Sequence, residues 1–436
     1  IDSIKNEINY DKILNYALLI LGFAIVSGFF RFLIRETVIV VSRKIEYDLR
    51  QVFWEHLQKL SMRFFANSST GNLMAHATND IHAVRMYLGP AVMYSLDTVT
   101  KFIIIIGFML SINPLLTAYT LLPLPFLTFF VYKLSKKIHK KFTKIQEKFS
   151  ELTTKVQENL SGIRVIKSYV REKYEIDTFN KLSNDYLERN MDKIKIQAFF
   201  QPLLFMIAGT AVIIVIWAGG SMVIEGAMTL GEISAFIAYL GMLIWPMIAF
   251  GWVLNIIQQA DASMRRVNNI LHEEIDIKDN EDTSYLINSI QGKIEFKNVW
   301  LKYRDDMDHV LKDINMEIPK GSTVAVIGHT GVGKSTLVNL IPRLMDTTAG
   351  QILIDGHDIN KIPLKVLRKH IAVVPQETFL FSDTLENNIL YGLHNGHSDE
   401  LLHKVAEISR IDKDVESFPK KYETILGERG ITLSGG

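Results

Sequence analysis

The sequence predicts two unlike domains in one chain: an all-α polytopic transmembrane helical domain, followed by an α/β domain of the P-loop NTPase class. The first is predicted by membrane-length stretches with few charges. Residues 13–30 are uncharged, 102–132 have no acid or base except tyrosine, and 196–264 have no Lys or Arg. The second is predicted by the C-terminal third, which has the mixed composition of a soluble domain and a complete phosphate-binding loop. We place the membrane domain at 1–270, a linker at 271–290 and the nucleotide-binding domain at 291–436.

The phosphate-binding loop lies at 328–335, which reads Gly-His-Thr-Gly-Val-Gly-Lys-Ser and fits the pattern G-x-x-x-x-G-K-[ST]. The apolar run 323–327 before it is predicted to be a strand, and the residues after it have helical spacing. Glycines let backbone N–H groups close around a β-phosphate at a helix N-terminus. Lys334 is expected to reach the β- and γ-phosphates of ATP, and Ser335 to bind Mg²⁺. The expected nucleotide contacts of the loop are Gly328, His329, Thr330, Gly331, Val332, Gly333, Lys334, Ser335 and Thr336.

Composition narrows the functional classes. The 436 residues carry 48 Lys and Arg against 47 Asp and Glu, and this net charge of +1 gives no indication of a nucleic-acid partner. Because the sequence has no cysteine, disulfides, thiol chemistry and cysteine-based zinc sites are excluded within it. The uncharged stretches exclude a soluble P-loop enzyme.

Clusters of basic residues set the expected topology, because Lys and Arg mark the cytoplasmic side of membrane spans. One cluster at 43–50 follows the first uncharged stretch, and a lysine cluster at 133–148 follows the next. If both are cytoplasmic, the chain crosses an even number of times between them, with its turn at Asn113-Pro114, where proline breaks helical hydrogen bonding. The same argument gives a second hairpin between 195 and 265. The five expected spans are 13–30, 88–112, 115–132, 199–224 and 230–258.

Both ends of the sequence are expected to be truncations. With the 43–50 cluster inside, residues 1–12 lie outside, and they carry no signal peptide that would bring them there. We therefore expect a further span upstream of Ile1. The sequence also stops within a motif, Leu433-Ser-Gly-Gly436, so the nucleotide-binding domain is expected to be incomplete.

The polar stretches 43–87 and 133–195 have apolar residues at helical spacing, so we expect helices that extend from the membrane into the cytoplasm and turn back near Gly71 and Gly162. The spans themselves contain charges, among them Asp97 and Lys101, which are spaced for an ion pair on one helix face. Two interpretations stay open for these charges: contact with a transported substrate, or snorkelling and pairing beside a cavity.

Three weaker motifs accompany the phosphate-binding loop. Tyr303 ends a predicted strand at 293–303, where its ring could stack on adenine or be an ordinary strand tyrosine. Gln376 ends a predicted buried strand at 371–376, where it could face a nucleotide or be a loop glutamine. Ser434 begins a glycine turn that could offer N–H groups to an anion or be any turn.

Taken in order along the chain, these motifs resemble those of an ATP-binding cassette (ABC) exporter, a half-transporter whose membrane domain precedes its nucleotide-binding domain. The resemblance covers the whole chain. Residues 328–336 are similar to the Walker A motif, Gln376 to the Q-loop, 433–436 to the start of the LSGGQ signature, and 427–430 to the X-loop. Tyr303 is similar to the adenine-stacking A-loop position, and the segments 69–80 and 158–167 resemble the two intracellular loops.

The resemblance implies ATP hydrolysis coupled to transport by a dimer of half-transporters. Lys334 and Gln376 are then the expected catalytic residues, and Ser335 and Gln376 the expected Mg²⁺ ligands. The further nucleotide contacts are Tyr303 and, from the other half, Leu433, Ser434, Gly435 and Gly436. The implied location is the cytoplasmic membrane, with several spans, lipid contact and the nucleotide-binding domain in the cytoplasm. The family has six spans in each half, and its Walker B carboxylate follows the signature, so this fragment alone is expected to be inactive.

Two other functions share every motif seen in the sequence. One is a half that binds ATP but hydrolyses it weakly beside a catalytic partner, and the other is an ATP-gated channel or regulatory subunit. A drug-like or lipid-like amphipathic cargo is implied by the resemblance only, and whether the dimer is homomeric or heteromeric is not readable from the sequence.

Overall fold

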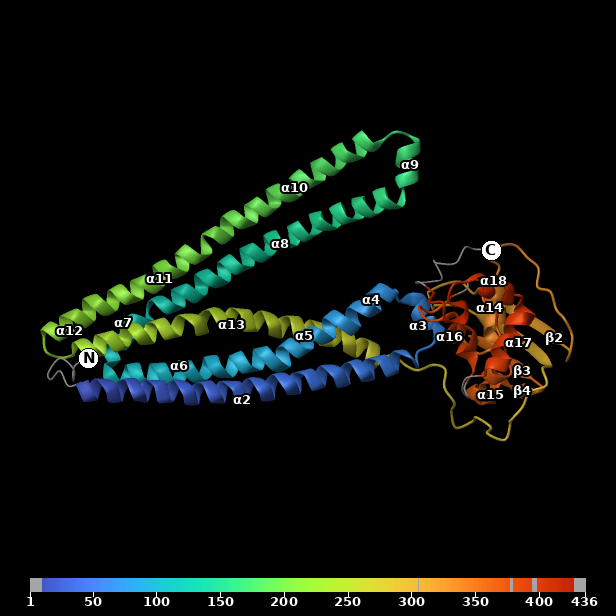
Figure 1. Cartoon of the computed structure of the whole chain (residues 1–436), viewed down its shortest axis with the longest axis horizontal. Helices are drawn as coiled ribbons and strands as arrows, with labels where there is room; N and C mark the ends of the chain where they lie inside the picture. The colour runs from blue at the N-terminus through green and yellow to red at the C-terminus, as the bar shows by residue number, and fades with distance from the viewer. Residues whose placement is uncertain (1–9, 305, 377–378, 394–397, 427–436) are drawn as a thin grey trace. The chain divides into compact units, whose positions relative to one another are not determined.

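A computed structural model describes residues 10–304, 306–376, 379–393 and 398–426. The chain divides into two compact units, Ile1–Asp276 and Ile277–Gly436, and each is described by itself. Unit 1 is helical, and unit 2 combines a small sheet with short helices (Figure 1).

Unit 1 consists of long helices joined by short turns and by three π-helical segments, η1 (His76–Asp80), η2 (Tyr87–Ala91) and η3 (Val215–Gly219). The α-helices are α2 (Tyr10–Leu57), α3 (Met62–Asn67), α4 (Thr70–Ala75), α5 (Ile81–Met86), α6 (Val92–Ile112), α7 (Pro114–Leu121), α8 (Pro123–Ser161), α9 (Ile163–Ser168), α10 (Glu172–Ala198), α11 (Phe200–Ile214), α12 (Gly220–Ile224) and α13 (Leu230–Leu271). Helices α8 and α10 run side by side as a pair connected through α9 (Figure 1).

Four helical segments in the described part are long and apolar enough to span a membrane: Tyr10–Leu57, Thr70–Ile112, Phe205–Ile224 and Leu230–Leu271. No more than 29% of the most apolar window of any of them is buried within the unit, so most of this apolar surface requires lipid or another protein subunit. The expected span at 115–132 is not among them, because the chain breaks the helix at Leu122 and α8 begins at Pro123.

The turns between the apolar helices have local causes. Asn113 caps α7 by accepting a hydrogen bond from the Leu116 N–H at 3.0 Å, and Pro114 occupies the first helical position, as the sequence predicts for this turn. Thr229 and Glu232 form a reciprocal capping box at the start of α13. The two hairpins therefore turn where local side chains satisfy the free ends of the helices.

The prediction of turns at Gly71 and Gly162 is half right. Gly162 separates α8 from α9. Gly71 lies inside the first turns of α4, and the chain instead leaves α2 at Leu57 and caps α4 with Ser69, whose hydroxyl accepts from the Asn72 N–H. Serine at a helix N-cap is the stronger signal here, since glycine alone marks conformational freedom rather than a helix boundary.

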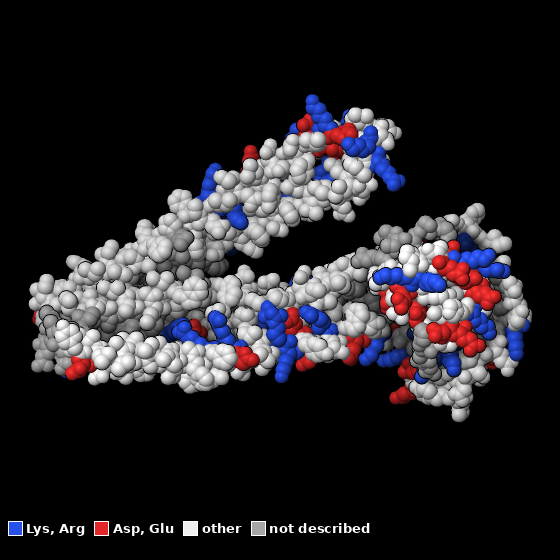
Figure 2. Space-filling view, in the orientation of Figure 1, with Lys and Arg blue, Asp and Glu red and all other residues white. Residues whose placement is uncertain are grey.

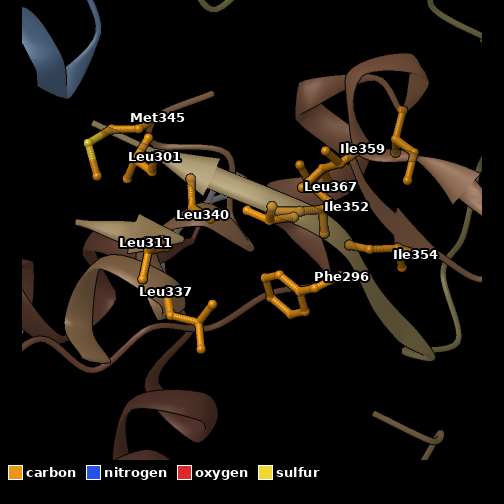
Figure 3. Packing of buried hydrophobic residues seen from close by; sticks show 12 residues of the cluster. Phe296, Leu301, Leu311, Leu337, Leu340, Met345, Ile352, Ile354, Ile359 and Leu367 are labelled. Carbon is orange, nitrogen blue, oxygen red and sulfur yellow. The ribbon is translucent and has the colours of Figure 1, made fainter. Parts of the chain in front are cut away.

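Unit 2 contains a four-stranded antiparallel sheet of order β2-β1-β3-β4, formed by β1 (Ile294–Leu301), β2 (Leu311–Ile318), β3 (Ala349–Ile354) and β4 (His357–Asp358). Its helices are α14 (Lys334–Leu340), α15 (Leu364–Lys369), α16 (Leu385–Ile389), α17 (Asp399–Ser409) and α18 (Asp412–Ser417). Leu337 and Leu340 of α14 pack into one apolar core with Phe296 of β1 and Ile352 of β3 (Figure 3). This packing fixes α14 on the sheet and thereby fixes the position of its N-terminus.

The predicted strands at 323–327 and 371–376 are wrong for the structure: both segments are described, and neither forms a strand. Apart from Ile371, which packs partly buried against the core, their side chains are exposed, with Ile327 at 92% and Val374 at 91%. A strand needs a hydrogen-bonded neighbour as well as an apolar pattern, and the described sheet offers none to either segment. Both segments have the apolar pattern of a strand, but a segment forms a strand only where another strand is hydrogen-bonded to it.

The β3–β4 hairpin carries a carboxylate that ties the start of unit 2 together. Asp355 and Gly356 occupy its two-residue loop with φ of 51° and 81°, the conformation for which an Asp-Gly pair is suited. The Asp355 carboxylate accepts hydrogen bonds from the backbone N–H groups of Gln291, Gly292 and Lys293, the last at 3.0 Å. Burial raises the pKa of Asp355, but these three donors outweigh burial and hold that pKa below its ordinary value.

We expect Asp355→Asn to weaken this anchor by about 1–2 kcal/mol at neutral pH, since hydrogen bonds to a charged acceptor are the stronger kind. Because the folded-state pKa of Asp355 is depressed, its stabilisation is complete above the ordinary value of about 4 and is lost as pH falls through the folded value. Amide hydrogen exchange at residues 291–293 of the full-length protein measures the effect. Equal exchange in the wild type and the Asn variant at pH 7 would contradict it.

Candidate functional site

The phosphate-binding loop forms a turn that leads directly into α14. Gly331 and Gly333 adopt left-handed φ values of 88° and 92°, and Gly333 is the N-cap residue of the helix. Left-handed glycines alternating with other residues turn backbone N–H groups toward one side, and the helix N-terminus that follows them favours negative charge. The local backbone therefore suits an anionic phosphate group, as the sequence predicts.

Gly333 lies in a tight place with a backbone conformation that disfavours a side chain. A Cβ atom there would lie 3.0 Å from Leu311 Cδ2 and 3.1 Å from Val310 Cγ1, at a φ that side-chain-bearing residues rarely adopt. The close approach of the loop to the segment that begins β2 thus depends on glycine. This cradle is the structural observation that fits the loop to a nucleotide phosphate.

Lys334 places its ammonium group inside the loop. Its Nζ donates to the backbone carbonyls of Gly328 and His329, both at 2.8 Å. The ammonium therefore lies among the loop residues, where a phosphate held by the same backbone would be its natural counter-charge. Ser335 follows on the first turn of α14, with an exposed side chain that is accessible to a metal ion.

Tyr303 lies next to the helix that follows the phosphate-binding loop. Strand β1 ends at Leu301, two residues before Tyr303, and the Tyr303 hydroxyl lies 2.7 Å from Thr336 Oγ1. Thr336 is buried in α14, so this hydrogen bond fixes the aromatic ring beside the helix that carries Lys334. The structure thus joins two of the predicted site residues that are 33 positions apart.

We expect Tyr303→Ala to weaken ATP binding by about tenfold while changing phosphate release less, because a stacked aromatic ring is worth about 1–3 kcal/mol. Tyr303→Phe separates the ring from the hydroxyl, since it keeps the ring and removes the hydrogen bond to Thr336. Equilibrium binding of a fluorescent ATP analogue to the full-length protein measures both. Unchanged affinity for ATP in the Ala variant would show that Tyr303 does not stack on adenine and is an ordinary tyrosine at the end of a strand.

The remaining predicted residues are not brought to the loop by the described structure. Gln376 lies in an exposed bend, and no hydrogen bond joins it to residues 328–336 within the described ranges. The motif residues 427–430 and 433–436 lie outside the described residues. No cluster of three His, Asp or Glu side chains suited to a metal occurs in the part of the chain that was described.

Sequence reasoning missed the role of one buried charge cluster in unit 1. Asp80, 7% exposed, accepts from Arg266 Nε at 2.9 Å and from Ser263 Oγ at 2.8 Å, and its other partner is His76 Nδ1 at 2.6 Å. The cluster ties η1 to α13 across 186 residues of sequence. The four-residue spacing of His76 and Asp80 could have indicated their contact from the sequence. The contacts of Asp80 with Ser263 and Arg266 could not be predicted in this way, because those residues are distant in the chain.

Other charges of unit 1 are also paired, and the Asp97–Lys101 pair forms at the spacing that the sequence predicts. Lys101 Nζ lies 2.6 Å from Asp97 Oδ2 on α6, and both side chains are partly exposed. Glu46 of α2 is buried between Arg43, Arg50 and Arg85, at 3.0, 3.1 and 3.4 Å. Pairing lowers the cost of placing these charges near apolar surroundings.

A P-loop nucleotide site joined in one chain to membrane-length helices defines an ATP-using membrane protein. The family profile of the ABC transporter transmembrane region matches residues 1–247, and that of the ABC transporter matches residues 311–436. The chain therefore belongs to the ABC transporter family, as its resemblance in sequence indicates.

Individual relatives agree with this assignment. The chain is 34% identical over 434 residues to the multidrug resistance-like ATP-binding protein MdlA of Buchnera aphidicola, covering 99% of this chain and 74% of the relative. It is 36% identical over 396 residues to the probable multidrug resistance ABC transporter ATP-binding/permease protein YheI of Bacillus subtilis, covering 90% and 67%. The structure of a bacterial Atm1-family ABC exporter with ATP bound matches with a TM-score of 0.75 at 24% identity, over 100% of this chain and 76% of that chain, which shows the fold.

Proposed function

We propose that this protein is one half of a dimeric exporter that uses ATP to move an amphipathic, drug-like or lipid-like substrate across the cytoplasmic membrane. The observation that carries the proposal is the phosphate loop held at the N-terminus of α14 in the same chain as four membrane-length helices. The multidrug resistance names of the relatives support the class of substrate.

In this proposal the backbone N–H groups of residues 328–336 bind the ATP phosphates, and Lys334 neutralises charge on the β- and γ-phosphates. Tyr303 positions the base, held through its hydrogen bond to Thr336. Mg²⁺, when bound through Ser335 and Gln376, supplies further charge neutralisation. Lys334 is poised for this role because its ammonium already lies inside the loop.

Dimer closure is proposed to use a second half that contributes its Leu433, Ser434, Gly435 and Gly436. Ser434 and the glycine N–H groups of that half would contact the γ-phosphate, so closure depends on ATP and reverses after hydrolysis. Such a bridge would connect the chemistry at Lys334 to movement of the helices in unit 1.

The proposed topology has five spans in residues 1–270 and places the nucleotide-binding domain, 291–436, in the cytoplasm. The lysines that follow 115–132 support the cytoplasmic assignment of α8, since positive charge is retained on that side. In Figure 2 the part of unit 1 that carries α11, α12 and the first half of α2 is almost free of blue and red side chains.

The test is ATP turnover of the full-length protein, purified alone and reconstituted in lipid. We expect turnover without any added partner, as a homodimer with two working sites requires. Bound ATP without turnover would instead indicate a weakly hydrolysing half that needs a catalytic partner. Ion current without stoichiometric ATP use would indicate a channel and would contradict the proposal.

A further inference from the structure

The lysines of α8 divide into two groups according to whether a carboxylate pairs with them in the described part of the chain. Five of them recur at three- and four-residue spacing and so share one face: Lys133, Lys136, Lys137, Lys140 and Lys144. We call this set the lysine stripe. All five side chains are exposed, and none lies within ion-pair distance of a carboxylate in the described part of the chain.

The other lysines of the helix are neutralised by carboxylates. Lys141 Nζ lies 2.6 Å from Asp192 Oδ2, and Lys148 Nζ lies 3.6 Å from Asp185 Oδ2, both on α10. Lys155 makes the same kind of contact with Glu175 at 2.6 Å. These three lysines are therefore paired within the protein, whereas the charges of the lysine stripe have no such partner among the described residues and are available to an external anion.

The sequence around the lysine stripe offers it no acidic neighbour. No Asp or Glu occurs between residues 98 and 146, so the stripe is the end of a long segment without negative charge. Immediately before it, Phe129, Phe130 and Tyr132 expose aromatic rings, and Lys133 Nζ lies 5.9 Å from the Phe129 ring centroid. Exposed aromatic rings followed by lysines are typical of the boundary between membrane core and headgroups.

We propose that the lysine stripe of α8 binds the headgroups of anionic phospholipids in the cytoplasmic leaflet. This rests on the proposed topology, in which residues 115–132 span the membrane and Lys133 follows directly. Polybasic segments directly cytoplasmic of a span are attracted to anionic lipid, and the attraction fades within a Debye length.

The geometry predicts a gradient along the lysine stripe. From Lys133 to Lys144 the helix rises about 16 Å, whereas one headgroup layer is about 5–8 Å thick. Long lysine side chains can reach back toward the membrane surface, so Lys136, Lys137 and Lys140 still make contact. Lys144 lies farthest from the headgroups, where their electrostatic attraction is weak, and is expected to contribute least to lipid binding.

The test uses the full-length protein in vesicles that contain spin-labelled phosphatidylglycerol or phosphatidylcholine. The measured quantity is the preference of the motionally restricted lipid for the anionic species. We expect a preference at low salt that falls as salt rises, and that drops severalfold in the triple variant Lys136→Gln, Lys137→Gln, Lys140→Gln. Each lysine nearest the membrane should account for up to about fivefold.

Adjacent residues supply the matched control. Lys140→Gln and Lys141→Gln remove the same charge at almost the same height, but only Lys140 belongs to the lysine stripe, because Lys141 is paired with Asp192. We expect Lys140→Gln to lower the anionic preference and Lys141→Gln to leave it within error. Equal effects of the two changes, or no effect of the triple variant, would overturn the proposal. Loss of anionic cargo transport with lipid preference intact would reassign the lysine stripe to cargo.

A failure of the topology is distinguishable from a failure of lipid binding. His139→Cys introduces a single thiol into this cysteine-free segment, at an exposed position between the lysines. A membrane-impermeant maleimide should label it in inside-out vesicles and not in right-side-out ones. Labelling from the cytoplasmic side without lipid preference rejects the lipid site alone, whereas labelling from the outside rejects the topology and with it the proposal.

Discussion

Lys334→Ala is expected to lower ATP turnover of the full-length protein by about 10²–10³-fold, the loss typical of removing one preorganised electrostatic contact from a reaction centre. The structural reason is the position of Nζ, which lies inside the phosphate loop against the carbonyls of Gly328 and His329. No other lysine or arginine within the described residues makes hydrogen bonds to this loop, so no neighbour replaces the charge. Steady-state phosphate release measures the effect.

Two controls show what the Lys334 result means. Lys334→Arg keeps the charge but is not equivalent, because a planar guanidinium is a different shape from a compact ammonium, so it should recover only part of the rate. The melting transition of unit 1 should not change, because its apolar clusters are built from its own residues. Near wild-type turnover in Lys334→Ala would contradict the assignment of the phosphate site.

Asp80→Asn is the second change with a large expected effect. It leaves Arg266 beside a neutral partner and weakens the contacts of Asp80 with Ser263 and His76. Removing one member of a buried ion pair costs about 3–5 kcal/mol. The Arg266 side chain is 48% exposed and can be rehydrated, so we expect about 1–3 kcal/mol. The expected result is a lower melting temperature of the membrane domain with ATP binding retained.

Helix α13, which carries Arg266, also provides a matched control for the Asp80 substitution. Asp261 and Arg265 form an i,i+4 ion pair at 3.1 Å on α13, but their side chains are 62% and 77% exposed. Asp261→Asn should therefore change stability by less than about 1 kcal/mol. A double-mutant cycle of Asp80→Asn with Arg266→Gln isolates the coupling between the two residues. Equal shifts in melting temperature for Asp80→Asn and Asp261→Asn would show that the cluster does not stabilise the domain.

The features that the sequence could predict are those encoded by neighbouring residues. The phosphate loop is eight consecutive residues followed by a predicted helix, and the structure confirms that helix as α14. The Asn113-Pro114 turn and the Asp97–Lys101 pair were predictable for the same reason, since each rests on contacts within four positions. Four of the five expected spans fall within helices that are long and apolar enough to cross a membrane.

The features that the sequence could not predict depend on distant residues. Segments 323–327 and 371–376 have strand-like patterns, but a strand also needs a partner, and the described sheet pairs β1 with β2 and β3 instead. The Asp80–Arg266 contact joins residues 186 positions apart, which no local spacing can reveal. The turn expected at Gly71 was misplaced for a local reason. The hydroxyl of the N-cap residue Ser69 determines where α4 begins, and Gly71 lies inside that helix.

The most direct test of the account is ATP-dependent uptake of a fluorescent amphipathic dye into inside-out vesicles that contain the full-length protein. Uptake that requires ATP, and that disappears in Lys334→Ala vesicles with equal protein content, is the predicted result. Uptake that persists in the Lys334→Ala vesicles, or that proceeds without ATP, would contradict the claim that the phosphate loop of α14 drives transport.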